Sequence, residues 1–199
     1  MSRTVLLFAK PPRIGLAKTR LARGVGPAAA QRIARMTMAT TIRAATDQRW
    51  TLSLYTAPDP YVSVRTDPLW PPGLDRFSQG RGNLGHRLDR AYADAPAGPV
   101  LFIGADCPGL TAALLWRAFK GLASHDAVFG PADDGGFWLF GLTKTYRSQT
   151  PFSGVRWSTP DTLSDVLANL PASARTHALP TLLDIDTATD WKAWQAQKS

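Results

Sequence analysis

The chain has 199 residues, of which 44% are hydrophobic, so it is long enough for one buried core, and we expect a single domain over residues 1–199. Its one cysteine, Cys107, excludes an internal disulfide and a zinc site built from several thiolates. No apolar run approaches the ~20 residues that a membrane helix needs, and no signal peptide is recognisable, so we expect a soluble, cytoplasmic protein without a membrane partner.

The charge of the chain favours anionic partners, because the formal net charge is +8 and every acidic residue is an aspartate. The arginines occur singly, without a basic run and without an array of aromatic residues between them. This distribution argues against nucleic-acid binding, and it favours a phosphorylated small molecule as the partner.

The first predicted strand, Thr4–Ala9, is followed by a loop that is rich in cations. We expect Pro11, Pro12 and Gly15 to prevent regular structure in residues 10–23. The spacing of a Walker phosphate loop is absent, yet lysine and arginine side chains can bind phosphate oxygens directly. The loop is therefore either a phosphate-binding segment or a solvated basic loop. Its cations are Lys10, Arg13, Lys18, Arg20 and Arg23.

The next elements complete a β-α-β unit and lead into a glycine-rich turn. The patterns predict a helix at Pro27–Thr46 and a strand at Thr51–Ala57. After a proline-rich connection they predict a short strand near Arg76 and a helix at Leu84–Ala95. The turn before that helix either lines a pocket for a base or sugar or serves only as a turn. Its residues of interest are Gln79, Gly80, Gly82, Asn83 and Gly85.

A continuous apolar run, Val100–Ile103, predicts a strand that is buried on both faces of a parallel sheet. Asp106 follows just after the carboxyl end of this strand, where open α/β sheets bind their ligands. Pro108 and Gly109 separate it from a helix that starts near Thr111. Asp106 is therefore a candidate ligand-binding residue, and the alternative is that it only forms the turn or caps the helix.

Two further aspartates, Asp133 and Asp134, lie between predicted strands at Ala127–Gly130 and Phe137–Leu142. Adjacent side chains on an extended chain point in opposite directions, so both can face one ligand only if the chain turns, which the following glycines permit. The aromatic residues of the second strand are expected in the core. The remaining predicted elements are helices at Ala112–Leu122, Asp161–Leu170 and Thr187–Gln195, and a strand at Ala178–Leu183, which we expect at an edge or a bulge because Pro180 limits its pairing.

Asp184 and Asp186 are two residues apart, so in extended backbone their carboxylates point to the same side, a geometry that suits one divalent cation. Hard oxygen ligands without a Cys/His cluster favour Mg²⁺ or Mn²⁺ over zinc. The alternative is that Asp186 or Thr187 only caps the last helix. Cys107 and the three histidines show no catalytic pattern, so we do not expect a covalent mechanism.

Five motifs together resemble the DUF2064 family, which belongs to the nucleotide-diphospho-sugar transferase superfamily with the GT-A fold. They are Phe8–Leu21, Gly104–Leu110, Gly130–Leu139, Trp157–Thr159 and Asp184–Thr187, and they span nearly the whole chain. The resemblance implies a three-layer α/β/α fold with a mostly parallel central sheet. It also implies similarity to phospholactate and molybdopterin guanylyltransferases, in which a Lys/Arg loop holds the nucleotide and two separate aspartates bind Mg²⁺.

Lys18, Arg20, Asp106 and either Asp184 or Asp186 match those positions of the related enzymes, so the resemblance implies the same roles here. The expected catalytic residues are Lys18, Asp106 and, as a base on the acceptor side, Asp133 or Asp134. The expected metal ligands are Asp106, Asp184 and Asp186, for Mg²⁺ or Mn²⁺. The expected nucleotide-binding residues are Ala9, Lys10, Arg13, Gly15, Lys18, Arg20, Gln79, Gly80, Asn83 and Gly85.

The expected function is metal-dependent transfer of a nucleotidyl group, of guanylyl type, from a nucleoside triphosphate to a small phosphorylated or hydroxyl acceptor. Two features favour it: the basic loop offers more cations than a metal-bound diphosphate needs, and Asp106 stands alone instead of in an Asp-x-Asp pair. One alternative is a GT-A glycosyltransferase that uses a nucleotide-diphospho-sugar, including an arsenosugar type. Another is a non-catalytic nucleotide-binding module, which would have no use for carboxylates at separate strand ends.

Overall fold

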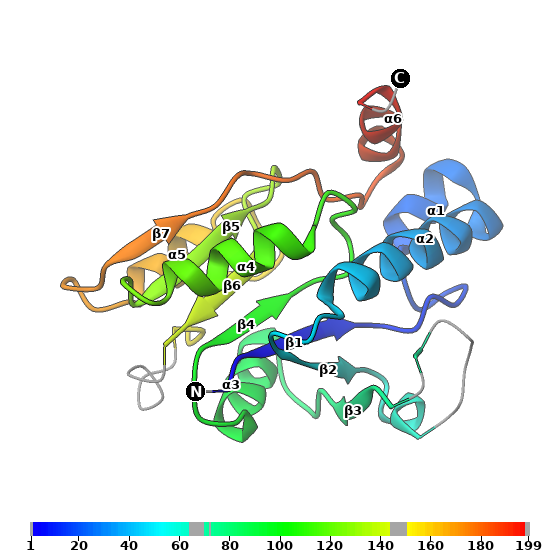
Figure 1. Ribbon diagram of the computed structural model, residues 1–199. Helices are drawn as coiled ribbons and strands as arrows, with labels where there is room; N and C mark the ends of the chain where they lie inside the picture. Colours follow the sequence, from blue (N-terminus) through cyan, green and yellow to red (C-terminus); the bar gives the residue numbers. More distant parts are fainter. Residues whose placement is uncertain (1, 64–69, 72, 144–150, 198–199) are drawn as a thin grey trace.

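A seven-stranded sheet lies at the centre of the computed structural model, which describes residues 2–63, 70–71, 73–143 and 151–197 (Figure 1). The strand order is β3-β2-β1-β4-β6-β5-β7, and neighbouring strands are parallel except where β6 pairs with β4 and β5. The mostly parallel sheet expected from the sequence is confirmed. The strands are β1 (Thr4–Ala9), β2 (Thr51–Thr56), β3 (Asp75–Ser78), β4 (Val100–Ile103), β5 (Ala127–Pro131), β6 (Phe137–Leu142) and β7 (Thr176–Ala178).

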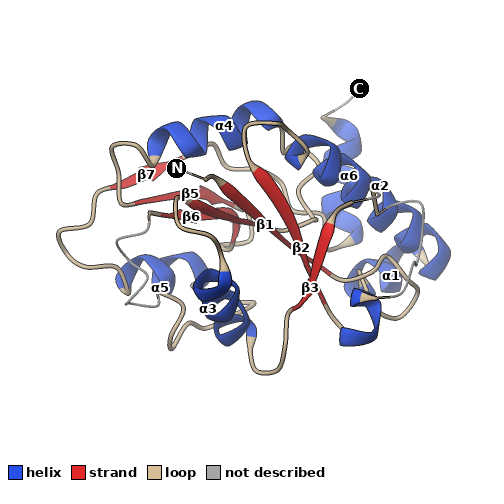
Figure 2. Ribbon diagram, turned by 60° about the horizontal axis from the view of Figure 1, so that its bottom comes forward, coloured by secondary structure: helices blue, strands red, loops and turns tan. Residues whose placement is uncertain are grey.

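Helices cover both faces of the sheet, which confirms the expected three layers (Figure 2). Residues of α2 and α4 share one buried cluster with Val5 and Leu7 of β1, whereas residues of α3 and α5 share another with Leu6. This alternation is typical of a strand that is covered on both faces. No helix in the described part of the chain is long and apolar enough to cross a membrane. The helices are α1 (Thr19–Val25), α2 (Pro27–Ala45), α3 (Leu84–Asp94), α4 (Ala112–Gly121), α5 (Thr162–Ala168), α6 (Ala188–Ala196) and the 3₁₀ helix η1 (Asp59–Val62).

The order of the strands reverses at β1, because β2 lies on one side of it and β4 on the other. Helix α2, which precedes β2, packs on one face of the sheet, and helix α3, which precedes β4, packs on the opposite face. In open α/β sheets such a reversal leaves a crevice at the carboxyl ends of the two central strands, where ligands bind. The topology therefore predicts a ligand-binding site at the loops after β1 and β4.

One prediction about the loop after β1 is wrong, because residues 19–25 form helix α1. The prolines and the glycine that disfavour regular structure all precede Lys18, and Leu21 is fully buried beyond them. Tertiary packing of Leu21 therefore stabilises a seven-residue helix that would be marginal by itself.

The last strand also differs from its prediction, because β7 ends at Ala178, where the sequence pattern predicts its start. Pro180 has no N–H for the sheet, and its carbonyl accepts the indole N–H of Trp138. Beyond it only Leu182 forms an isolated bridge, with Ala132. The expected position at the edge of the sheet is confirmed.

A small buried cluster attaches the C-terminal segment to the helices after β1. Ile185 is fully buried with Leu21 of α1 and with Ala30 and Ile33 of α2. Two partly buried tryptophans of α6, Trp191 and Trp194, pack against the same cluster. Ile185 therefore fixes the position of the two aspartates on either side of it.

We predict that Ile185→Ala lowers the free energy of unfolding by about 2–5 kcal/mol, because the substitution leaves a cavity in this cluster. Ile14→Ala is the matched control, since Ile14 is 60% exposed and its truncation should cost less than about 0.5 kcal/mol. Urea unfolding followed by circular dichroism measures both changes. Equal losses in the two variants would show that Ile185 is not an anchor.

Candidate active site

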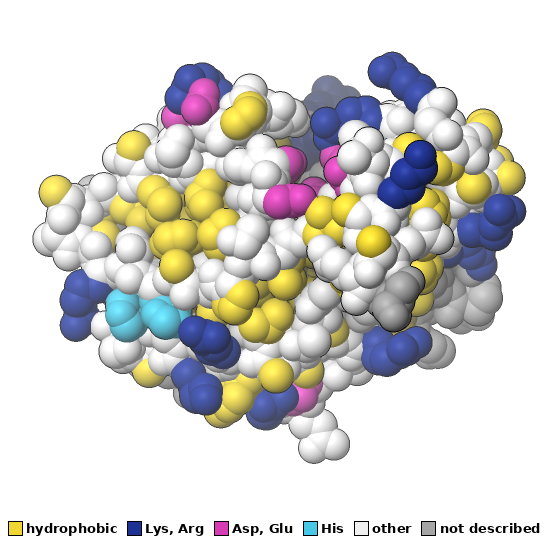
Figure 3. All heavy atoms as spheres, turned by 90° about the horizontal axis from the view of Figure 1, so that it is seen from above, with side chains coloured by type: hydrophobic (Ala, Val, Ile, Leu, Met, Phe, Trp, Pro, Cys, Tyr) yellow, Lys and Arg dark blue, Asp and Glu magenta, His cyan; other side chains and the backbone are white. Residues whose placement is uncertain are grey.

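A pocket of about 460 Å³ opens at the carboxyl ends of β1 and β4. In Figure 3 acidic side chains gather beside a hollow of the surface, and basic side chains lie next to them. The pocket is lined by the loop after β1, the start of α3, the loop after β4, the β5–β6 turn, residues 157–159 and the segment before α6. Its charged groups therefore come from distant parts of the sequence.

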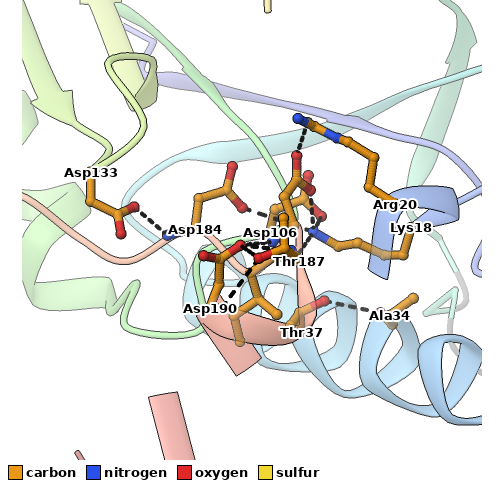
Figure 4. Close-up of polar contacts among 11 residues, drawn as sticks. Lys18, Arg20, Ala34, Thr37, Asp106, Asp133, Asp184, Thr187 and Asp190 are labelled. Carbon is orange, nitrogen blue, oxygen red and sulfur yellow. Dashed lines mark hydrogen bonds and ion pairs between the residues drawn. The ribbon is translucent and has the colours of Figure 1, made fainter. Parts of the chain in front are cut away.

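The ammonium group of Lys18 lies among three carboxylates of this pocket (Figure 4). Its Nζ is 2.6 Å from Asp106, 3.0 Å from Asp186 and 3.8 Å from Asp184. The Lys18 side chain is only 4% exposed, and it also donates a hydrogen bond to the carbonyl of Ile185. The three aspartates thus have the proximity that a shared metal needs. Lys18, which we expected to contact phosphates, contacts carboxylates in this structure.

Arg20 supplies a second cation to the cluster, since its guanidinium group pairs with Asp186. The Arg20 side chain is more than half exposed, so solvent screens this pair more than it screens Lys18. Both basic side chains belong to the start of α1, and both reach toward the carboxylates in Figure 4.

Two hydrogen bonds from backbone N–H groups hold residues 184–186 beside the loop after β4 and the β5–β6 turn. The N–H of Ile185 donates to the Asp106 carbonyl at 3.1 Å, and the N–H of Asp184 donates to the Asp133 carboxylate at 3.0 Å. The second contact is visible in Figure 4. Asp133 therefore positions the backbone of this segment.

The carboxylates of the cluster do not serve as helix caps. Thr111 caps α4 by accepting the N–H of Leu114, so Asp106 is not needed there. Thr187 and Asp190 form a reciprocal capping box at the start of α6. The side chains of Asp106 and Asp186 are thus available for cations.

Burial and neighbouring charges shift the ionisation of the cluster. Burial, followed by the negative charge of Asp106, raises the pKa of Asp184 to about 8, although Lys18 opposes the rise. Burial alone would lower the pKa of Lys18, but the charges of the three carboxylates outweigh it and raise that pKa. Burial also raises the pKa of the Cys107 thiol well above its usual value, which keeps this thiol neutral.

The acidic cluster has the chemistry of a divalent-metal site. One carboxylate oxygen from each of Asp106, Asp184 and Asp186 lies within 4.8 Å of the others. Asp184 Oδ1 is buried and accepts no hydrogen bond from any described residue. Such hard oxygen donors suit Mg²⁺ or Mn²⁺, and carboxylates bind metals in their deprotonated form.

Half of the expected nucleotide-binding residues line the pocket: Ala9, Lys10, Lys18, Arg20 and Gln79. Lys10 makes no ion pair within the described ranges, so its charge is available to an anionic ligand. The amide of Gln79 is already used, because it donates to the Tyr55 carbonyl at 3.0 Å and accepts from Arg87 at 3.2 Å.

The other expected nucleotide-binding residues do not line the pocket. Arg13 and Gly15 are exposed in the loop, where the guanidinium group of Arg13 lies over the ring of Tyr61. In the turn that contains Gly80, the N–H of this residue donates to Ser78 Oγ.

Asn83 and Gly85 likewise have structural roles at the start of α3. Asn83 caps the helix by accepting the N–H of His86. A Cβ at Gly85 would collide with the Phe152 carbonyl, so the close approach requires glycine. These contacts favour the alternative in which the segment serves as a turn.

The structure distinguishes Asp133 from Asp134, the two aspartates of the β5–β6 turn that the sequence left as alternatives for the base on the acceptor side. Asp134 lines the pocket, whereas Asp133 does not and binds the backbone of Asp184.

The sequence pattern also predicted that Phe137 lies in the core, but this ring is half-buried and lines the pocket. Thr37 of α2 lines it too, and no motif marked this residue. A helical pattern shows which face is apolar but not which end of that face meets a crevice.

Several solved structures resemble the whole chain. A protein of Desulfovibrio desulfuricans G20, described as a candidate nucleotide-diphospho-sugar transferase, has a TM-score of 0.86 at 26% identity, over 100% of this chain and 89% of that one. The 4-diphosphocytidyl-2C-methyl-D-erythritol synthase of Anaerococcus prevotii has a TM-score of 0.63 at 11% identity, over 99% and 98%. Rv0371c of Mycobacterium tuberculosis H37Rv in complex with manganese has a TM-score of 0.58 at 17% identity, over 97% of both chains.

No curated protein matches the chain in sequence. A family profile described as "Uncharacterized protein conserved in bacteria (DUF2064)" matches residues 38–159, which is more than half of the chain. This stretch includes the loop with Asp106, the β5–β6 turn and Trp157–Thr159, three of the five motifs that carry the resemblance. The chain belongs to the DUF2064 family.

Proposed function

We propose that this protein is a divalent-metal-dependent transferase that moves a nucleotidyl group from a nucleoside triphosphate to a small acceptor. The observation that carries the proposal is the cluster of Asp106, Asp184 and Asp186 beside Lys18 at the carboxyl ends of the central strands. The likeness to a candidate nucleotide-diphospho-sugar transferase and to a cytidylyl-type synthase of the same fold supports a nucleotide substrate.

Asp106, Asp184 and Asp186 would hold Mg²⁺ or Mn²⁺, and the manganese complex of a protein with this fold is consistent with such a site. When bound, the metal would neutralise phosphate charge that develops in the transition state. Lys10, which has no ion pair among the described residues, would bind a phosphate group directly.

Lys18 and Arg20 would exchange partners when substrate binds. In the structure their positive charges neutralise the carboxylates that the metal would need. A dication and an ammonium group cannot both occupy the space between these oxygens, because like charges a few Å apart repel strongly. Both side chains would therefore turn to the nucleotide phosphates. Asp134, on the other side of the cluster, would orient the acceptor and take its proton.

A glycosyltransferase is the second candidate, and one observation removes an argument against it. The sequence suggested five cations for the nucleotide, but among the described lining residues the cations are Lys10, Lys18 and Arg20. Three cations are compatible with a metal-bound diphosphate as well as with a triphosphate. The two reactions differ in the bond that breaks, so their products distinguish them.

We predict that Lys18→Met increases the affinity for Mn²⁺ without nucleotide by about tenfold or more, because it removes a positive charge from the metal position. Electron paramagnetic resonance of free Mn²⁺ measures this affinity. Lys10→Met is the matched control and should leave it unchanged, since Lys10 makes no ion pair with described carboxylates. Unchanged or weaker Mn²⁺ binding in Lys18→Met would mean that the lysine does not occupy the metal position.

We also predict release of pyrophosphate from one nucleoside triphosphate, with GTP tested first, when Mg²⁺ or Mn²⁺ and a panel of acceptors are supplied. Asp106→Asn should reduce this turnover by about 100-fold or more, since it removes an anionic ligand at similar volume. Release of nucleoside diphosphate from a nucleotide sugar, without pyrophosphate from any triphosphate, would establish the glycosyltransferase instead. Nucleotide binding without any turnover would identify a binding module.

A further inference from the structure

The side chains that line the pocket divide by charge into two walls. All described lining cations, Lys10, Lys18 and Arg20, come from the loop after β1 and the start of α1. The opposite wall, here called the acceptor wall, has no lysine or arginine among its described lining residues. It consists of Asp134 from the β5–β6 turn, Phe137 from the start of β6, and Trp157, Ser158 and Thr159.

The acceptor wall is held rigidly by contacts outside the pocket. Gly135 has a φ of +85°, and a Cβ there would collide with the backbone of Pro160, so the β5–β6 turn packs directly on the loop 156–162. The N–H of Leu163 donates to the Gly135 carbonyl at 3.1 Å. The turn and the loop therefore form one preorganised surface.

Arg156 is the cation nearest in sequence to this surface, and its charge is neutralised away from the pocket. Its guanidinium group and its backbone N–H bind the Asp165 carboxylate at 2.7–2.9 Å, and Asp161 lies 2.8 Å from it. Arg156 does not line the pocket. An anionic acceptor would thus meet no described cation on this wall.

Two polar groups of the acceptor wall remain free for a ligand. Ser158 is exposed, has a φ of +62°, and its hydroxyl makes no hydrogen bond with another described residue. Asp134 Oδ1 accepts the N–H of Gly136 at 2.9 Å, which leaves Oδ2 for another donor. The hydroxyl of Thr159 is already bound to the Arg156 carbonyl.

We infer that the acceptor wall binds an uncharged, polyhydroxylated molecule, such as a sugar or polyol, and disfavours a phosphorylated one. A phosphate group on this wall would lie beside the Asp134 carboxylate with no described lysine or arginine of the wall to neutralise it, and such juxtaposition of like charges disfavours binding. Hydroxyl groups can instead donate to Asp134 and exchange hydrogen bonds with Ser158, while Phe137 and Trp157 provide apolar contact area.

This inference rests on the proposed function, and it specifies the acceptor. A hydroxyl oxygen of the acceptor would form the new bond to the α-phosphorus, and the bond from that phosphorus to the bridging oxygen would break. Pyrophosphate would leave with the bonding electron pair. The hydroxyl proton would pass to the Asp134 carboxylate and then to water. The products would be a nucleoside monophosphate ester of the acceptor, and pyrophosphate.

Binding of simple probes tests the inference independently of turnover. In protein with ¹⁵N-labelled tryptophan, the indole signal of Trp157 is assigned by its loss in Trp157→Phe, and methyl α-D-glucopyranoside, myo-inositol and glucose 6-phosphate are titrated separately. We expect a neutral probe to shift this signal at a concentration at least about tenfold lower than glucose 6-phosphate does. Tighter binding of glucose 6-phosphate, or no shift with either neutral probe, would overturn the inference.

Two conservative variants test which side chains of the acceptor wall bind the probes. Ser158→Gly keeps the left-handed backbone without strain and removes the hydroxyl, so neutral-probe binding should weaken by about 2- to 10-fold, the effect of one hydrogen bond. Asp134→Asn keeps the bond to Gly136 and removes the charge, so binding of glucose 6-phosphate should improve relative to the neutral probe. If neither variant changes the ratio of the affinities for the neutral probe and for glucose 6-phosphate, the inference is also overturned.

A separate titration with GTP and Mn²⁺ distinguishes this inference from the proposed function. If the triphosphate does not bind but a neutral probe shifts the Trp157 signal as described, the proposed function fails and the specificity of the wall stands. If the triphosphate binds and yields pyrophosphate only with phosphorylated acceptors, the proposed function stands and the inference fails.

Discussion

The structure of the site depends on one interaction, the ammonium group of Lys18 among three carboxylates. Removing charges from water is costly unless they are paired, so α1, the loop after β4 and residues 184–186 must come together if these groups are buried. Lys18 itself has left-handed backbone, with a φ of 54°, at the start of α1. Non-glycine residues adopt this conformation at a cost, and such strain is common at functional sites. The ion pairs and the burial of Ile185 oppose that cost.

The topology of the sheet explains why the pocket has two different walls. The reversal of strand order at β1 sends the cationic loop and α1 to one side of the carboxylates and the β5–β6 turn to the other. Each wall is therefore built from separate segments of the chain. In the proposed reaction, cations suit the substrate that carries phosphates, whereas an aspartate with hydroxyl and aromatic groups suits an acceptor that must give up a proton.

The fold alone does not identify the reaction. Solved proteins that share it include a 4-diphosphocytidyl-2C-methyl-D-erythritol synthase at 11% identity and a candidate nucleotide-diphospho-sugar transferase at 26% identity, so the same fold occurs with different named activities. The chemistry of this chain depends on its own side chains. In the described residues, these place the carboxylates of Asp106, Asp184 and Asp186 between the wall that carries the lining cations and the acceptor wall.

The sequence by itself determined the strands and helices that have strong periodicity, the family, and the positions of Asp106, Asp184 and Asp186 at the ends of elements. These features depend on local patterns of apolar residues and on the alternation of side chains along extended backbone. Only the tertiary structure decided that Lys18 faces carboxylates, that Asp134 lines the pocket while Asp133 holds the Asp184 backbone, and that Gly85 approaches the Phe152 carbonyl too closely for a Cβ. It also decided that Leu21 stabilises a helix where local signals predicted a loop. The physical reason is that each of these outcomes depends on contacts between residues far apart in sequence, which no local pattern contains.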